Sequence, residues 1–244
     1  MAKVKLFTKN ILEDSTVTVT GTADTGYPES RLFDRAISLY WKDTITEAKT
    51  FHVDQGASGW DVVDALFIPK HNFSGYDLTW EYSDDDALWL PAVSGWTQGD
   101  NNQIEKTLPS SLTHRYWKVT LSSMANPQCS EIFMGYGYEF QADFHKNPSW
   151  EDTPNVVWNQ TVGGLERSTK LGNKRRTRSY LMYLNSTTKV TFRTAMADLD
   201  NYSKPFYFKD HEGNYFMARL LDVPPEDFMT EGDLTLPISV IEML

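Results

Sequence analysis

The chain has 244 residues, 40% hydrophobic and 14% aromatic, which is enough for one large β domain or two modest domains with buried cores. A net charge of −10 at pH 7 argues against nucleic-acid binding, because phosphate recognition needs clustered lysine and arginine. No run approaches the roughly 20 apolar residues of a membrane span, so we expect no membrane span.

The first residues carry lysines but no apolar stretch followed by a small-residue cleavage site. We therefore expect no secretion signal and synthesis in a cytoplasm. The single cysteine, Cys129, cannot form an internal disulfide and lacks the second thiol of a cysteine-rich zinc site. No basic residue flanks it to lower its pKa, so we expect a buried, unreactive thiol.

The first half alternates polar and apolar residues with a period of two, which is typical of strands with one buried face. The pattern is clearest in 76–82, where Leu78 and Trp80 share a face and Asp77, Thr79 and Glu81 share the other. Five such segments are 16–20, 51–54, 60–68, 76–82 and 115–121. Between them lie clusters of turn-forming residues at 56–59, 83–86 and 99–102. Many short strands separated by turns predict an antiparallel sandwich or barrel.

A polar segment with two prolines, 145–154, cannot easily continue a sheet and marks a boundary. Beyond it, 176–184 is predicted to be a strand, and 187–202 fits a helix or a strand. Two hairpin arms, a turn between them and a final strand follow, at 205–209, 210–213, 214–221 and 234–241. The predicted fold is mainly β, with an antiparallel jelly-roll β-sandwich over 1–145, a linker at 146–154 and a smaller β-rich α+β domain over 155–244.

The order of motifs in the first half resembles the discoidin-like (F5/8 type C, galactose-binding-like) jelly roll. Residues 26–34 with Trp41 are similar to the opening loop of that family, and 51–56 to its strand ending in Asp-Leu-Gly. Its Ser-x-Asp-Gly-x-x-Trp turn, Arg-Tyr strand and closing Glu-ϕ-x-ϕ-Gly strand are matched by 82–89, 115–119 and 131–135. Asp86 stands where that turn usually has glycine, a departure that aspartate tolerates because it reaches the left-handed conformation at modest cost.

Residues 150–244 resemble the carboxy-terminal part of phage and prophage tail-associated proteins that carry such a sandwich in front. The shared layout is a basic strand, a short helix, a strand at Lys204-Pro205-Phe206 and a final strand. This resemblance implies a phage or prophage virion structural protein of the tail, assembled in the host cytoplasm. Its implied partners are other virion proteins, and a homo-oligomer is an open possibility.

The residues give no sign of an enzyme or a cofactor. The five histidines show no metal-ligand spacing, and no nucleophile elbow, phosphate loop or dinucleotide motif is present. We therefore expect no catalytic residues, no cofactor and no metal site, and a hydrolase stays an alternative that would need two facing carboxylates. Asp84, Asp85 and Asp86 form either a solvated turn or a calcium site that lacks EF-hand spacing.

The alternative function is a carbohydrate-binding module that attaches to cell-surface glycans, because aromatic faces stack on sugar rings. Trp60, Trp80 and Trp117 lie on predicted strands and are expected in the core. The candidate carbohydrate-binding residues are therefore those near turns and strand ends: His71, Asn72, Trp89 and Trp96. Packing or turn hydrogen bonding is the competing explanation for each of the four.

One basic run interrupts the acidic chain at 167–178. Its candidate partner-binding residues are Arg167, Lys170, Lys174, Arg175, Arg176 and Arg178. It lacks interleaved aromatic residues, and it leads into a predicted strand. We therefore interpret it as a solvated sheet face or as an edge that binds an acidic neighbour, such as the amino-terminal half of another copy.

Overall fold

The computed structural model describes residues 3–140, 149–154, 156–160, 166–170, 174–200, 202–224, 227–230 and 233–243. The chain forms two compact units, one made of residues 7–137 and the other of residues 1–6 with 138–244. The division into domains at 1–145 and 155–244 stays a prediction. The predicted linker, 146–154, lies partly outside the described residues, and Ser149–Thr153 within it form a strand.

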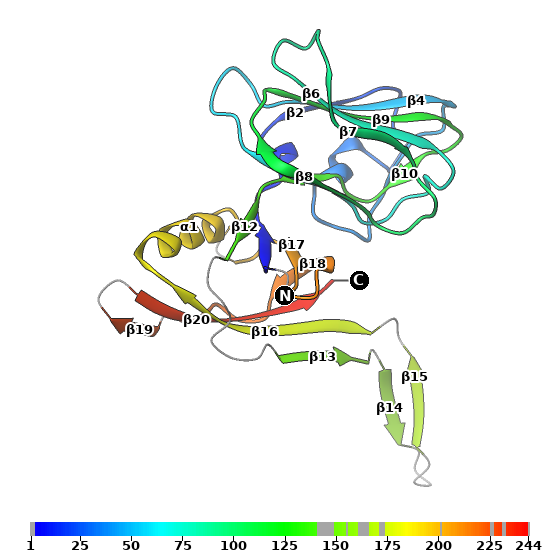
Figure 1. The fold of residues 1–244 in the computed structure, drawn as a ribbon. Helices are drawn as coiled ribbons and strands as arrows, with labels where there is room; N and C mark the ends of the chain where they lie inside the picture. Colours follow the sequence, from blue (N-terminus) through cyan, green and yellow to red (C-terminus); the bar gives the residue numbers. More distant parts are fainter. Residues whose placement is uncertain are drawn as a thin grey trace. The chain divides into compact units, whose positions relative to one another are not determined.

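The unit of residues 7–137, here called the sandwich unit, is built from antiparallel sheets (Figure 1). One sheet, here called the main sheet, contains five strands among the described residues, in the order β2 (Thr16–Val19), β4 (Glu47–Asp54), β9 (Tyr116–Met124), β6 (Asp77–Ser83) and β7 (Leu90–Thr97). The second sheet has the described order β11 (Phe133–Gly135), β5 (Val63–Ile68) and β8 (Ile104–Leu112). Smaller elements are β3 (Trp41–Lys42) paired with β10 (Gln128–Cys129), η1 (Ile11–Glu13) and η2 (Glu29–Leu32).

The core of the sandwich unit lies between the two sheets, and the predicted alternation is confirmed there. Trp117, Val119 and Leu121 on β9 are fully buried, while the residues between them are half-buried on the other face. Trp80 of β6 packs beside Trp117, with ring centroids 5.6 Å apart. Burying each large apolar side chain stabilises the fold by about 1.5–3 kcal/mol. The predicted mainly β fold with an antiparallel sandwich is therefore confirmed.

A buried carboxylate ties three segments of the sandwich unit together. Glu131 accepts hydrogen bonds from Asn10 Nδ2 at 3.2 Å and from the backbone N of Arg35 at 2.9 Å. Burial raises the pKa of Glu131 well above its ordinary value. Because Asn10 also bonds the backbone of Ile132 and Met134, this network fixes the closing segment against the first loop.

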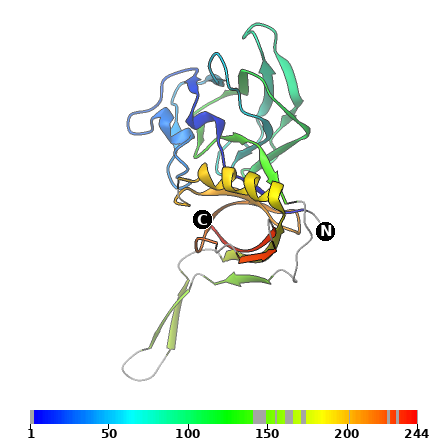
Figure 2. The same cartoon turned by 90° about the vertical axis from the view of Figure 1, so that its left-hand side faces the viewer.

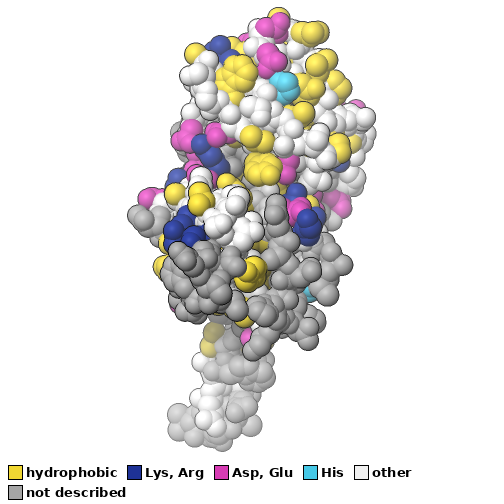
Figure 3. All heavy atoms as spheres, turned by 60° about the vertical axis from the view of Figure 1, so that its left-hand side comes forward, with side chains coloured by type: hydrophobic (Ala, Val, Ile, Leu, Met, Phe, Trp, Pro, Cys, Tyr) yellow, Lys and Arg dark blue, Asp and Glu magenta, His cyan; other side chains and the backbone are white. Residues whose placement is uncertain are grey.

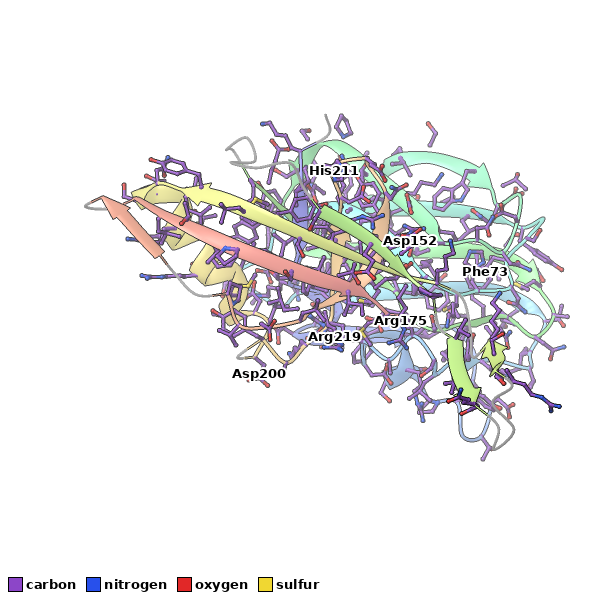
Figure 4. All side chains as sticks on the ribbon, turned by 90° about the horizontal axis from the view of Figure 1, so that it is seen from below. Phe73, Asp152, Arg175, Asp200, His211 and Arg219 are labelled. Atoms are coloured by element: carbon purple, nitrogen blue, oxygen red, sulfur yellow. The ribbon has the colours of Figure 1, made fainter. Side chains whose placement is uncertain are left out.

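The second unit contains a long curved sheet covered by α1 (Ser186–Ala197) (Figure 2). Its described strand order is β12 (Gly137–Glu139), β1 (Lys5–Phe7), β17 (Phe206–Lys209), β18 (Tyr215–Leu220), β20 (Asp233–Glu242), β16 (Arg175–Leu184) and β13 (Ser149–Thr153), with β19 (Asp227–Thr230) also paired to β20. A separate hairpin joins β14 (Val156–Gln160) to β15 (Glu166–Lys170). Figure 4 shows β13, β16 and β20 side by side.

The segment predicted as a helix or a strand at 187–202 contains α1, which begins earlier and ends at Ala197. Asn185 caps its first turn by accepting hydrogen bonds from the backbone N of Thr187 and Thr188. The helix stops because Asp200 adopts a positive φ of 46°, which an α-helix cannot contain. Phe192 and Met196 pack into the core beneath it.

Among the described residues, no helix is long and apolar enough to cross a membrane. Cys129 is fully buried in the core of the sandwich unit, as predicted. Burial raises the pKa of its thiol, so the reactive thiolate is disfavoured.

Candidate functional site

The outer face of the main sheet carries a row of half-buried polar and aromatic side chains. Because Phe51, Val53 and Val119 point into the core, the alternate residues of β4 and β9 point outward. The register pairs Lys118 with His52 on one side and with Glu81 on the other. We call the group formed by His52, Glu81, Trp89, Tyr116 and Lys118 the sheet-face cluster.

Trp89 lies in the middle of the contacts of this cluster, just before β7 begins. The Lys118 ammonium lies 4.0 Å from the centroid of the Trp89 ring and 3.3 Å from the Glu81 carboxylate. The His52 ring approaches Trp89 edge-on at a centroid distance of 5.7 Å and lies equally far from Tyr116. The cluster therefore holds aromatic rings, a cation and a carboxylate in fixed positions on a surface that solvent reaches.

A second ion pair borders the cluster at the end of β4. Arg115 donates two hydrogen bonds to the carboxylate of Asp54, at 2.7 and 2.9 Å, and its guanidinium lies 4.6 Å from the centroid of Tyr116. These hydrogen bonds lower the pKa of Asp54 below its ordinary value. Asp54 is therefore ionised at neutral pH and fixed in place.

The acidic turn that precedes Trp89 is held to the sheet by two histidines. His52 contacts Asp86 at 2.9 Å, and His114 contacts Asp84 at 2.8 Å. Asp85 accepts hydrogen bonds from the backbone N of Ala87 and Leu88, which closes the turn. Within the described part of the chain, no group of three or more acidic, histidine or cysteine side chains is arranged to hold a metal ion. This turn is thus organised by internal hydrogen bonds.

Trp96 lies at the other end of β7 from Trp89. Trp96 is seven positions after Trp89, a distance of roughly 23 Å along an extended strand. Trp96 packs partly against the core, its Nε1 donates to Gln98, and the Lys106 ammonium lies 4.4 Å from its ring centroid. The four candidate carbohydrate-binding residues are therefore divided between two ends of the sandwich unit.

His71 and Asn72 lie at the same end as Trp96 and are engaged within the protein. The buried His71 ring contacts the carbonyl of Asn102 through Nε2 at 2.6 Å, and its Nδ1 accepts from the backbone N of Phe73. Burial lowers the pKa of His71. Asn72 bonds the backbone of Asn126 and Gln128 through its side-chain amide. Both side chains join loops at this end of the sandwich unit.

The six candidate partner-binding residues of the second unit divide into two groups. Arg178 is buried and faces Asp210 at 3.5 Å and Asp152 at 3.7 Å, while Arg176 is half-buried and lies 3.6 Å from Glu242. Figure 4 labels Asp152 on β13. The remaining four side chains are exposed, on β15 or at the start of β16: Arg167, Lys170, Lys174 and Arg175.

Four members of the sheet-face cluster were not among the residues selected from the sequence. His52, Glu81, Tyr116 and Lys118 each occupy the polar half of an alternating strand, which was interpreted only as the wet face of a sheet. Pairing the polar positions of β4, β9 and β6 would have placed three of them in one row. The strand register needed for that pairing depends on contacts between distant segments, so the alternation alone cannot give it.

Comparison with known proteins finds partial similarity to solved structures. No family model matches the chain, and no curated protein matches it. A Ruminococcus gnavus GH29 fucosidase matches 55% of the chain at 18% identity with a TM-score of 0.46, and the match spans 28% of that enzyme. The Clostridium perfringens protein CpGH89CBM32-6 matches 54% at 21% identity with a TM-score of 0.44, over 99% of its length.

Chitosan-binding module 1 of a Paenibacillus chitosanase/glucanase matches 52% of the chain at 19% identity with a TM-score of 0.43, over 99% of that module. The prediction of a phage or prophage tail-associated virion protein is wrong, because the similar structures are carbohydrate-binding modules and a glycosidase. That prediction relied on the order of a basic strand, a short helix and later strands in 150–244. Such an order arises in many unrelated α+β sheets, so it does not specify a function.

Proposed function

We propose that the sandwich unit binds carbohydrate through the sheet-face cluster. A sugar ring presents an apolar face of C–H groups surrounded by hydroxyls that donate and accept hydrogen bonds. A surface that binds it needs a flat aromatic ring beside fixed polar groups. The sheet-face cluster supplies both, because Trp89 and Tyr116 lie among His52, Glu81 and Lys118.

The observation that carries the proposal is the position of Lys118 between Trp89 and Glu81. Its ammonium touches the face of the indole and the carboxylate at the same time, at 4.0 and 3.3 Å. All three residues are half-buried, so the orientations of their side chains are restricted while part of each residue stays accessible to solvent. Charged donors and acceptors held in this way form stronger hydrogen bonds to hydroxyls than neutral groups do. Little side-chain freedom remains to be lost on binding.

The state of the nearby carboxylates supports binding without turnover. Hydrolysis of a glycosidic bond uses one carboxyl group as an acid and a second as a base or nucleophile. Asp54 is paired to Arg115 and its pKa is lowered, so it does not carry the proton that a general acid must donate. Glu81 is bound to Lys118. We therefore assign the cluster a binding role.

A glycan array probed with the full chain, followed by calorimetric titration of the strongest ligand, tests this function. We expect saturable binding that Trp89→Ala weakens by about tenfold or more, as for a central aromatic contact. Lys118→Met keeps the aliphatic stem and should weaken binding by removing the charged donor.

Trp96→Ala is the matched control, because Trp96 is also half-buried beneath a lysine ammonium but lies at the opposite end of β7. It should leave the affinity within about twofold of wild type. Circular dichroism of each variant establishes that it is folded. Absence of binding to every glycan would refute the function, and equal affinity of wild type and Trp89→Ala would refute the site.

A further inference from the structure

The hairpin of β14 and β15 forms a sheet of its own in the second unit. Its strands pair with each other from Val156↔Lys170 to Gln160↔Glu166, and the described strands of the curved sheet pair elsewhere. Figure 1 shows the hairpin extending away from β13 and β16. The side chains described as exposed on it are Val157, Asn159, Gln160, Arg167, Ser168, Thr169 and Lys170.

Such a hairpin gains little from the forces that stabilise the rest of the fold. A two-stranded sheet is at best marginally stable in water, because it has no second layer against which to bury a face. Among the strands that the structure describes, none pairs with the outer edge of β14 or of β15, and such an edge can pair with another chain. Both properties favour a segment that becomes ordered against a partner.

The charge of this region indicates the kind of partner. Residues 166–178 contain six basic side chains and one acidic side chain. Arg176 and Arg178 face carboxylates of the second unit, whereas Arg167, Lys170, Lys174 and Arg175 are exposed to solvent. The exposed cations therefore make this arm basic, with Arg167 and Lys170 on opposite faces of β15 because they lie three residues apart. A basic arm is suited to an acidic protein surface.

The chain itself contains an acidic unit that complements this arm. Residues 7–137 carry 18 acidic and 9 basic side chains, so almost the whole net charge of −10 belongs to the sandwich unit. Figure 3 shows acidic side chains on the visible surface of the described residues. We propose that the β14–β15 hairpin binds the sandwich unit of a second copy of this chain. The contact joins two different surfaces, so it is a heterologous, head-to-tail interface.

Light scattering coupled to size-exclusion chromatography tests this assembly on the full chain. At low ionic strength we expect a mass above that of a monomer that rises with protein concentration. At about 1 M salt the mass should fall to that of the monomer, because salt screens exposed charges. The double charge reversal Arg167→Glu with Lys170→Glu should weaken self-association by at least about tenfold.

The double variant Arg193→Glu with Arg219→Glu is the matched control, since both arginines are exposed in the same unit but lie outside the hairpin. It should associate like wild type. If the two double variants unfold at the same temperature, weaker association of the hairpin variant reflects the lost contact and not a loss of folding. A protein that is monomeric at every concentration, or one whose association survives reversal of the hairpin charges, would overturn the proposal.

Carbodiimide cross-linking of a mixture of isotopically light and heavy chains identifies the surfaces. We expect light–heavy links from Lys170 or Lys174 to carboxylates within residues 7–137. Links formed only within one chain would show that the arm contacts its own sandwich unit, and links only to residues 1–6 or 138–244 would show another interface. Either result would overturn the proposal. Because the measurement needs no sugar, it is independent of the proposed carbohydrate binding.

Discussion

Gly135 shows how a single residue constrains the closing strand of the sandwich unit. A Cβ atom built on it would lie 2.1 Å from the backbone carbonyl oxygen of Lys9. Because the clashing atom belongs to the backbone, no side-chain movement can remove the clash. The closing strand thus passes so near the first segment that only glycine fits. This contact gives a physical reason for the glycine of the Glu-ϕ-x-ϕ-Gly motif.

We predict that Gly135→Ala lowers the free energy of unfolding by about 1–3 kcal/mol, the usual range for overpacking a core. Gly99→Ala is the matched control, because nothing lies within 4 Å of a Cβ built at Gly99. Urea denaturation followed by tryptophan fluorescence measures both. Equal stability of Gly135→Ala and wild type would contradict the close approach.

His71 is a residue whose protonation state is coupled to folding. Burial lowers its pKa from 6.5, and protonation of Nδ1 would break the hydrogen bond from the backbone N of Phe73. A group with a lowered folded-state pKa binds fewer protons in the folded state than in the unfolded state. The stability it confers is present above pH 6.5 and is lost as the pH falls below that value.

We therefore expect the free energy of unfolding to decrease between pH 7.5 and pH 5, and the decrease to be smaller in His71→Gln. Denaturant titrations at several pH values measure this difference in slope. His114→Gln is a suitable control, since His114 lies on the partly exposed surface beside Asp84. An identical pH dependence of wild type and His71→Gln would show that His71 does not contribute.

At the scale of elements, Arg178 joins three parts of the second unit. It projects from β16 toward Asp152 on β13 and toward Asp210 and Glu212 in the turn between β17 and β18. Asp210 is fully buried, and its carboxylate also accepts hydrogen bonds from the backbone of that turn. Removing Arg178 would leave this carboxylate buried without its cation.

We predict that Arg178→Ala lowers the free energy of unfolding by about 3 kcal/mol or more, the usual cost of removing one partner of a buried ion pair. Arg175→Ala, at an exposed position of the same strand, should change it by less than about 0.5 kcal/mol. Chemical denaturation of both variants provides the comparison. If both substitutions changed the free energy of unfolding by a similarly small amount, Arg178 would be solvated and not part of a buried ion pair.

The strands that alternation predicted well are those whose two faces meet different surroundings. β4, β6 and β9 each bury one face in the core, so polar and apolar residues alternate along them and show which face points inward. β7 and β8 were not predicted, because they contain Pro91, Gly95 and Pro109 and many of their residues are exposed. An edge strand that is exposed on both faces needs no apolar residue at every second position, so it lacks the alternation. Proline and glycine within a strand are also typical of turns.

The candidate site was predicted only at Trp89. Its neighbours, His52 and Lys118, are 66 residues apart in the chain, and they meet only because β4 and β9 pair in one register. His71, Asn72 and Trp96 share the turn-rich surroundings of Trp89 in sequence, but hydrogen bonds and packing engage them inside the protein. Proximity to a turn does not distinguish a residue that binds a ligand from one that closes a loop.

At the scale of the whole molecule, the two units carry different kinds of surface. The sandwich unit holds the sheet-face cluster and nearly all the net negative charge, and the second unit carries the basic hairpin. In our account, one unit binds sugar and the other associates copies of the chain. Association would place several weak sugar sites on one particle and raise its avidity without any new contact to the sugar.

The central claim is that sugar binds on the outer face of the main sheet, against Trp89. The most direct measurement is a two-dimensional NMR titration of the isotopically labelled protein with its best array ligand. We expect the largest shifts at the Trp89 indole and at the amides of His52, Glu81 and Lys118, with none at Trp96. Shifts centred on Asn72 and Trp96, with the Trp89 indole unmoved, would contradict the claim.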